Sequence, residues 1–75
     1  MDASHSESDI HAGQYIRICL PEVGTFRGYI VRLGRHNGKI TYMIVDDEVR
    51  GERYLDLVTN DKWHLATYDT RGAGG

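Results

Sequence analysis

Residues 29–45 read YIVRLGRHNGKITYMIV, and this stretch decides the fold of the chain. Its centre, Asn37-Gly38, separates two runs that are rich in β-forming residues. An Asn-Gly pair in this setting is typical of a two-residue hairpin loop, because both central residues of a type I′ turn need a positive φ angle. The stretch therefore predicts two antiparallel strands joined at residues 37 and 38.

The position of the loop predicts which residues of the two strands lie opposite each other. With Asn37-Gly38 as the loop, Leu33 pairs with Tyr42 and Val31 pairs with Ile44. Because side chains alternate along a strand, the hairpin has two faces. We expect one face to point into the core, and its residues are Tyr29, Val31, Leu33, Ile40, Tyr42 and Ile44. The reverse face is apolar as well, and it consists of Gly28, Ile30, Arg32, Thr41, Met43 and Val45, with Phe26 beyond them.

Before the hairpin, residues 14–20 have the period of a β-strand. Ile16, Ile18 and Leu20 fall on one face of this segment, which we expect to be the core face, and the residues between them fall on the other. Pro21 follows directly. As the only proline of the chain, it ends the predicted strand and starts a turn.

After the hairpin, residues 53–59 and 63–68 predict a fourth and a fifth strand. A helix over residues 52–65 is the alternative. The turn-forming Asn60-Asp61 pair and the β-branched residues before it favour the two strands over the helix. We allow for one short helical turn at residues 60–63.

Five short strands between the two tails predict an all-β (mainly β) domain. We expect a small antiparallel five-stranded sheet that is strongly bent, or partly closed into a barrel of the SH3-like or OB-like kind. Four glycines stand where such a sheet needs bends or bulges: Gly24, Gly28, Gly34 and Gly51. The resemblance is one of architecture alone, because the acidic-aromatic loop and the paired-tryptophan groove of peptide-binding SH3 domains are missing.

The chain is short enough for one domain only. We expect this domain at residues 13–69, between a polar, disordered N-terminal tail at residues 1–12 and a flexible C-terminal tail at residues 70–75. The longest apolar runs are triplets such as residues 43–45, far too short to span a membrane, and the N-terminus lacks the apolar stretch of a signal peptide. These features predict a soluble cytoplasmic protein, either a monomer or a weak homodimer.

No group of residues in the sequence matches a known kind of active site, metal site or cofactor site. The four histidines are scattered, and Cys19, the single cysteine, cannot anchor a zinc site of the usual spacing. The acidic run Asp46-Asp47-Glu48 places its side chains on alternate sides of an extended segment. We therefore expect no catalytic residue, no metal and no cofactor, and a protein that is not an enzyme.

The aromatic residues offer a different kind of site. Tyrosine and tryptophan lose little side-chain entropy for the contact area that they provide, so they are frequent anchors of protein interfaces. We expect Tyr15, Tyr54 and Tyr68 to be exposed. Trp63 is expected to lie in the core or at its rim.

The apolar reverse face of the hairpin leads to the first hypothesis for function. A domain of this size cannot cover both faces of its sheet, so an apolar second face indicates either a closed barrel or a partner. The hypothesis is a non-enzymatic protein-binding module, a small regulator or inhibitor that docks on a larger intracellular machine. Transcription or defence machinery is an example, and the protein would resemble the accessory proteins of phages and mobile elements.

The binding residues of this module would form an apolar centre with basic residues around it. They are Arg27, Ile30, Arg32, Arg35, Lys39, Met43 and Val45. Such a surface suits a partner with an acidic patch, because complementary charge speeds the encounter while the apolar centre holds the complex.

The alternative hypothesis is a small β-barrel nucleic-acid-binding protein that uses the basic hairpin at residues 27–39. Its arginines and Lys39 would contact phosphates while Tyr29 or Tyr42 stacks on bases. The net charge of −2 and the acidic second half of the chain argue against this alternative. A nucleic-acid-binding domain usually carries an excess of basic residues.

Overall fold

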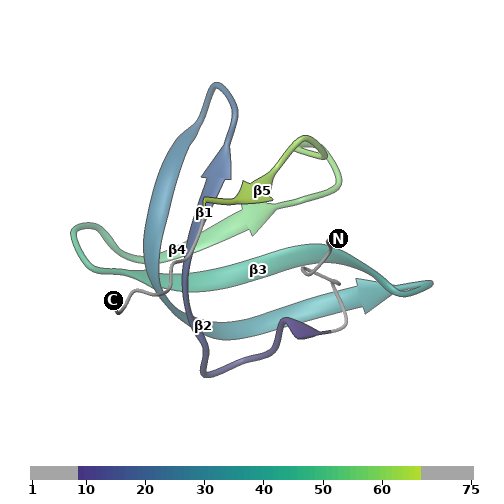
Figure 1. Cartoon of the computed structure of the whole chain (residues 1–75), viewed down its shortest axis with the longest axis horizontal. Helices are drawn as coiled ribbons and strands as arrows, with labels where there is room; N and C mark the ends of the chain where they lie inside the picture. The colour runs from purple at the N-terminus through teal and green to yellow at the C-terminus, as the bar shows by residue number, and fades with distance from the viewer. Residues whose placement is uncertain (1–8, 67–75) are drawn as a thin grey trace.

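The computed structural model describes residues 9–66, which form one antiparallel sheet of five strands (Figure 1). The strands are β1 (Tyr15–Leu20), β2 (Gly24–His36), β3 (Lys39–Asp47), β4 (Gly51–Asp56) and β5 (His64–Leu65). Their order in the sheet is β4-β3-β2-β1-β5. The predicted all-β fold of five antiparallel strands is confirmed. The described residues include no helix that is long and apolar enough to cross a membrane.

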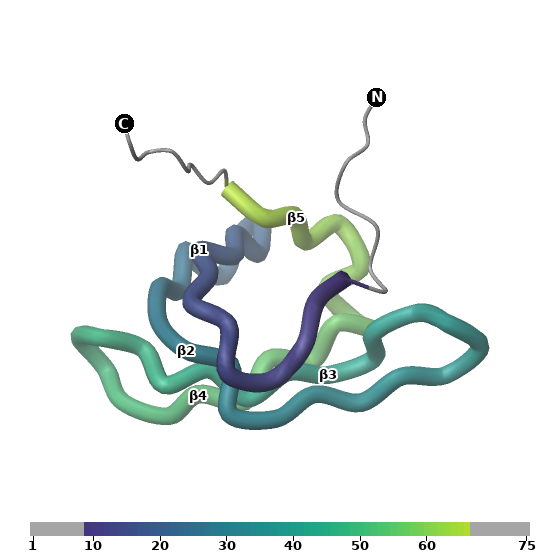
Figure 2. The backbone as a smooth tube through the Cα atoms, turned by 60° about the horizontal axis from the view of Figure 1, so that its bottom comes forward, coloured from purple at the N-terminus to yellow at the C-terminus, as the bar shows by residue number. Residues whose placement is uncertain are grey.

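β2 is long enough to take part in both halves of the sheet. Its first half pairs with β1 and its second half with β3, and the sheet bends so that β1 and β5 rise away from β3 (Figure 1). In Figure 2 the backbone curls around a central space, which the core side chains fill. The two edge strands, β4 and β5, are not hydrogen-bonded to each other, so the sheet is strongly bent but not closed.

The predicted hairpin loop is confirmed. Asn37 and Gly38 have φ angles of 54° and 81°, the positive values that a type I′ turn needs. His36 and Lys39, which flank the loop, lie opposite each other as the prediction requires. The local sequence therefore predicts this turn correctly.

The predicted register is right at the loop and again from the pair Ile30–Val45 onward, and it is wrong between the two bulges. One extra residue on each strand, Thr41 on β3 and Val31 on β2, forms a β-bulge and shifts the pairing between the two bulges by one position. Both predicted cross-strand pairs are consequently wrong. The observed pairs are Leu33 with Met43 and Arg32 with Ile44.

The two bulges exchange the faces of the hairpin. Because each bulge inserts one residue into a pattern of period two, the side chains beyond it move to the other side. Leu33 and Ile40, between the loop and the bulges, contribute to the core as predicted. Past the bulges the prediction is wrong, since Tyr29 and Val31 are 58% and 46% exposed. The core takes the reverse face instead, with Phe26, Ile30, Met43 and Val45.

The core draws hydrophobic side chains from four strands and from the segments beside them. It consists of Ile10, Ile18, Leu20, Phe26, Ile30, Ile40, Met43, Val45, Leu55 and Leu57. Ile16, Leu33, Trp63 and Leu65 are partly buried and pack against it. The predicted inner face of the first strand and the rim position of Trp63 are thus confirmed.

Ile10 lies in the segment for which the sequence predicts disorder, yet its side chain is buried in the core. The side chain of Gln14 accepts a hydrogen bond from the N–H of His11 at 2.9 Å and donates to the carbonyl of Asp9 at 3.1 Å. The guanidinium of Arg35 donates to the carbonyl of Ile10. The domain therefore begins before residue 13, because an apolar side chain and its backbone are held by the sheet.

The last two strands are shorter than the sequence predicts. β4 ends at Asp56, whose carboxylate accepts hydrogen bonds from the N–H groups of Val58 and Thr59 at 3.0 and 3.1 Å and so closes a turn. Residues 1–8 and 67–75 lie outside the described residues. The predictions for the C-terminal tail and for Tyr68 fall on them.

Candidate functional site

The apolar centre of the predicted binding site is the core of the domain. Met43 and Val45 have no exposed surface, and Ile30 is 2% exposed. The hypothesis of an open reverse face is therefore corrected in favour of its alternative, in which that face closes over the core. A partner cannot reach these three side chains while the domain is folded.

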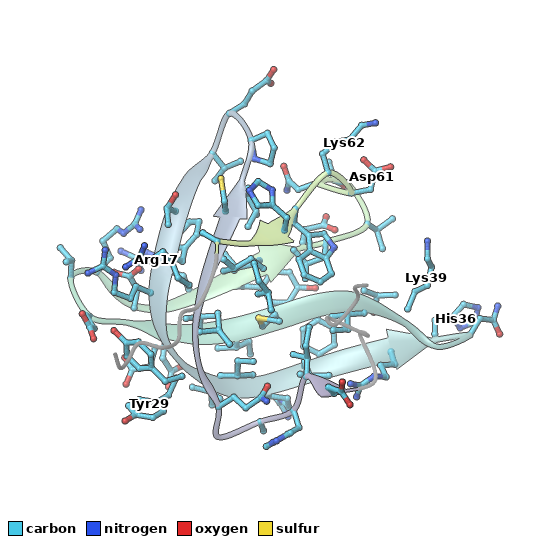
Figure 3. The ribbon with its side chains drawn as sticks, in the orientation of Figure 1. Arg17, Tyr29, His36, Lys39, Asp61 and Lys62 are labelled. Atoms are coloured by element: carbon cyan, nitrogen blue, oxygen red, sulfur yellow. The ribbon has the colours of Figure 1, made fainter. Side chains whose placement is uncertain are left out.

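The basic residues of the predicted site do not form a single patch. Lys39 lies beside the hairpin loop with His36 (Figure 3). Arg27 lies near the start of β2, opposite β1. Arg32 is exposed in the middle of β2. Arg35 pairs with Ile40 of the core and points its guanidinium to the N-terminal segment. A nucleic acid would have to reach along the whole of β2 to contact all four.

The outer face of the sheet, which points away from the core, carries a patch of aromatic and aliphatic side chains. Cross-strand pairing puts Tyr15 opposite Tyr29 on β1 and β2. It also places Ile44 of β3 between Arg32 of β2 and Tyr54 of β4. The outer patch, as we call this surface, consists of Tyr15, Tyr29, Val31, Tyr42, Ile44 and Tyr54.

Several side chains of the outer patch are open to solvent. Tyr54 is 64% exposed and Tyr15 47%, which confirms the prediction for both residues, and Tyr29 and Val31 are similarly exposed. Tyr42 and Ile44 are half-buried between their neighbours. Four of the six residues are those that the sequence assigns to the core. The site was missed there because the bulges cannot be read from the alternation.

Two ring pairs hold the outer patch in a fixed arrangement. Tyr15 and Tyr29 pack edge to face with their ring centroids 5.1 Å apart, and Tyr42 and Tyr54 stack at 5.4 Å. The ring of Tyr42 also covers Gly34 on the neighbouring strand, where a Cβ atom would lie 2.2 Å from the ring. Rings that are already held in place lose little freedom on binding, which favours their use as anchors.

Tyr15 is tied to the turn after β3. Its hydroxyl donates a hydrogen bond to the carboxylate of Glu48. This bond raises the pKa of the Tyr15 phenol, and the nearby Arg27 and Arg17 oppose the rise only in part. The phenol therefore keeps its proton at neutral pH and acts as a donor, not as a general base.

Asp47 is buried and its carboxylate is fully engaged. It accepts hydrogen bonds from the N–H groups of Val49 and Arg50 at 2.9 Å and of Arg27 at 3.1 Å, and it pairs with the Arg50 guanidinium at 3.1 Å. The Arg50 guanidinium first, and these N–H groups after it, hold the pKa of the carboxyl well below its usual range, although burial acts the other way.

The same arginine ties the turn to the strands beneath it. The Arg50 guanidinium donates to the carbonyl of Thr25 at 2.6 Å and lies 4.2 Å from the centre of the Phe26 ring. Asp47 and Arg50 thus fasten the β3–β4 turn to β2. Both groups are occupied by structural contacts, which leaves no lone pair of Asp47 free for a metal or a substrate.

Cys19 lies directly opposite His64 on β1 and β5. A cysteine beside an imidazole is a common arrangement in nucleophilic catalysis, but a third group that orients the imidazole completes such sites. Within residues 9–66, no three His, Cys, Asp or Glu side chains are grouped closely enough to hold a metal ion. Cys19 and His64 are thus cross-strand neighbours on β1 and β5.

Arg17 is a residue of the outer face that the predicted site omits. It lies directly opposite Arg27, and Figure 3 shows it on the same side of the molecule as Tyr29, away from the hairpin loop. The alternation of the first strand places Arg17 opposite the core side, but not beside Arg27. That pairing depends on the turn at residues 21–23, which has a φ of 71° at Glu22, a residue type with no preference for such an angle.

Comparison of the chain with protein-family models, with curated proteins and with solved structures found no match in any of the three. No family, relative or structural neighbour therefore indicates a function for the chain.

Proposed function

We propose that the chain is a non-enzymatic protein-binding module that docks through the outer patch. The observation that carries the proposal is an aromatic and aliphatic surface on the side of the sheet that the core does not use. Tyr29, Val31 and Tyr54 are each exposed by nearly half or more. Contiguous exposed apolar surface on a small soluble domain marks an interaction site more often than isolated apolar residues do.

The composition of the outer patch supports a protein as the ligand. Tyrosine is enriched at the centre of protein interfaces, where its ring is buried and its hydroxyl finds a partner. Charged residues lie next to the patch residues: Arg32 is opposite Ile44, and Asp46 and Glu52 continue the row that contains Tyr29. An apolar centre with a polar rim is the usual anatomy of an interface.

The proposed module acts by docking alone. A module that only docks acts on its partner by occupying part of the partner's surface, as a small regulator or inhibitor does. The cytoplasmic location and the likeness to phage accessory proteins, both expected from the sequence, belong to this proposal and stay predictions.

Photo-crosslinking tests the docking surface. A photoreactive phenylalanine analogue is placed at position 31 or 54 of the outer patch, and at position 39 beside the hairpin loop as the control. Each protein is irradiated in an extract of the cells that make it, and the products are identified by mass spectrometry. We expect positions 31 and 54 to capture the same protein, and position 39 not to capture it.

Competition makes this experiment specific. Excess unmodified protein should suppress the crosslink, and an excess of the folded double variant Tyr29→Ser/Tyr54→Ser should not. Equal suppression by both competitors contradicts docking through the outer patch. A product that nucleases remove, formed mainly at position 39, would support the nucleic-acid alternative instead.

A further inference from the structure

Two arginines face each other at the edge of the outer patch. Arg17 of β1 and Arg27 of β2 are directly opposite in the antiparallel register, and both are exposed on the outer face. Opposite residues of such a pair have Cβ atoms about 4.5–5.5 Å apart, so the two guanidinium groups can reach the same point in space. Like charges in this relation destabilise a sheet.

No acidic side chain of the described residues forms an ion pair with Arg17 or Arg27. Within residues 9–66, neither guanidinium makes a hydrogen bond or an ion pair, and the ion pair of this region joins Arg50 to Asp47. Glu48 is adjacent, because its N–H donates to the carbonyl of Arg27 at 2.9 Å. Its carboxylate accepts a hydrogen bond from the hydroxyl of Tyr15 and forms no ion pair with either arginine.

We infer that Arg17 and Arg27 form an anion-binding site for the carboxylates of an acidic segment of the partner protein. A carboxylate placed between two guanidinium groups accepts charge-assisted hydrogen bonds from both, and it removes their mutual repulsion. Tyr15 and Tyr29 lie one row along the sheet and give the same segment an aromatic surface for an apolar side chain. The site rests on the proposed function, since it names the chemistry of the docking partner.

The charges around the site favour a short acidic segment over a nucleic acid. The row next to the arginine pair continues from Tyr29 to Asp46 and Glu52, so positive charge gives way to negative charge across the sheet. A phosphate backbone that crosses this face would meet these carboxylates. A peptide whose acidic residues end at the arginines would not meet these carboxylates.

Titration of the full chain with a synthetic hexaglutamate peptide tests the site. Backbone amide spectra at low salt should show saturable shifts, centred on residues 15–17 and 27–29. Arg17→Gln and Arg27→Gln should each weaken binding at least about tenfold. The control is Arg53→Gln, which removes one positive charge from an exposed arginine of β4 that lies opposite the core residue Val45 and not in a row of the outer patch. We expect this variant to bind as the unmodified protein does, and circular dichroism confirms that all variants are folded.

Two outcomes would overturn the site. One is equal affinity for hexaglutamate in the Arg17 and Arg27 variants and in the Arg53 control. The other is tighter binding, at the same amides, of inorganic phosphate or of a single-stranded oligonucleotide, which would make the ligand a phosphate. The result is separable from the docking test. If positions 31 and 54 crosslink but hexaglutamate does not bind at the arginines, the docking surface is supported and the anion site is not. If hexaglutamate binds at the arginines but positions 31 and 54 do not crosslink, the anion site is supported and the docking surface is not.

Discussion

At the scale of single residues, the carboxylate of Asp47 joins parts of the chain that are distant in sequence. Its hydrogen bonds run to Arg27 of β2 and to Val49 and Arg50 in the turn after β3. Removing the carboxylate would take the acceptor from all three N–H groups at once, at a residue that is itself 4% exposed. Asp47 therefore contributes to the register of the sheet as well as to the turn.

The lowered pKa of Asp47 predicts a dependence of stability on pH. The folded-state pKa lies below the ordinary value of 3.8, so the unfolded chain takes up the proton more readily. The stabilisation is complete above that ordinary value and is lost as the pH falls from it toward the folded-state pKa. Asp47→Asn should therefore be less stable at neutral pH and lose less stability on acidification, as measured by urea unfolding at a series of pH values.

The remaining acid dependence in that variant has a known source. Asp56, whose pKa is lowered by the N–H and hydroxyl of Thr59 and the N–H of Val58, still titrates in the same direction. A variant with the same slope as the unmodified protein would mean that Asp47 is not held ionised by Arg50 and its neighbours.

The close approach of the neighbouring backbone to Gly28 predicts that a larger residue there destabilises the fold. A Cβ atom there would lie 2.0 Å from the carbonyl oxygen of Asp46, which is backbone and cannot move aside. At Gly34 the obstacle is the ring of Tyr42, a side chain that can turn away. Gly28→Ala should cost about 1–3 kcal/mol of unfolding free energy, and Gly34→Ala clearly less. Urea unfolding of both variants checks the order, and the reverse order would contradict the close approach at Gly28.

At the scale of elements, the β2–β3 hairpin combines a turn that has a recognisable sequence signal with two bulges that have none. The bulges at Val31 and Thr41 cancel, so the pairing at both ends of the hairpin has the register that the loop sets, and only the part between them is shifted. This shift lets Met43 and Ile30 join the same core as Leu33 and Ile40. Bulges of this kind also increase the local twist and bend of a strand.

The hairpin loop predicts the effect of a β-branched residue at position 38. Gly38 has a φ of 81° and open space around the position of a Cβ atom, so a substitution there meets backbone strain and no steric overlap. Gly38→Val should cost on the order of 1–2 kcal/mol. Thermal or urea unfolding measures this loss, with Lys39→Gln as an exposed control. Unchanged stability of Gly38→Val would contradict the type I′ loop.

At the scale of the whole molecule, one small core is shared by a bent sheet and the segment before it. Ile10 enters this core from outside the strands, and Trp63 and Leu65 pack against it from the C-terminal side. A domain of this size has a net stability of roughly 3–5 kcal/mol. The free energy lost on truncating a single core side chain is therefore comparable to the entire stability of the fold.

Two substitutions on opposite faces of the hairpin test the closed core. Met43→Asp places a carboxylate where no surface is exposed. The free-energy cost of burying an unpaired charge exceeds the stability of so small a domain. We expect this variant to be unfolded at neutral pH. Arg32→Glu, on the exposed face, should remain folded. Circular dichroism and amide-shift dispersion distinguish the two, and a folded Met43→Asp would mean that the reverse face is open.

The sequence by itself determined the class of fold, the hairpin loop and the side of the first strand that is buried. These features depend on local chemistry: Asn37-Gly38 adopts positive φ angles readily, and Ile16, Ile18 and Leu20 alternate over a short, uninterrupted segment. The exposure of Tyr15 follows from the same alternation.

Only the tertiary structure decided which face of the hairpin is core, that Ile10 belongs to it, and that Arg17 lies opposite Arg27. The reason is that a bulge adds one residue without a sequence signature of its own, and a shift of one residue exchanges the two faces. When both faces are apolar, as on β2 and β3, hydrophobicity cannot choose between them. The choice is made by the packing of side chains from β1, β4 and the N-terminal segment, which are distant in sequence.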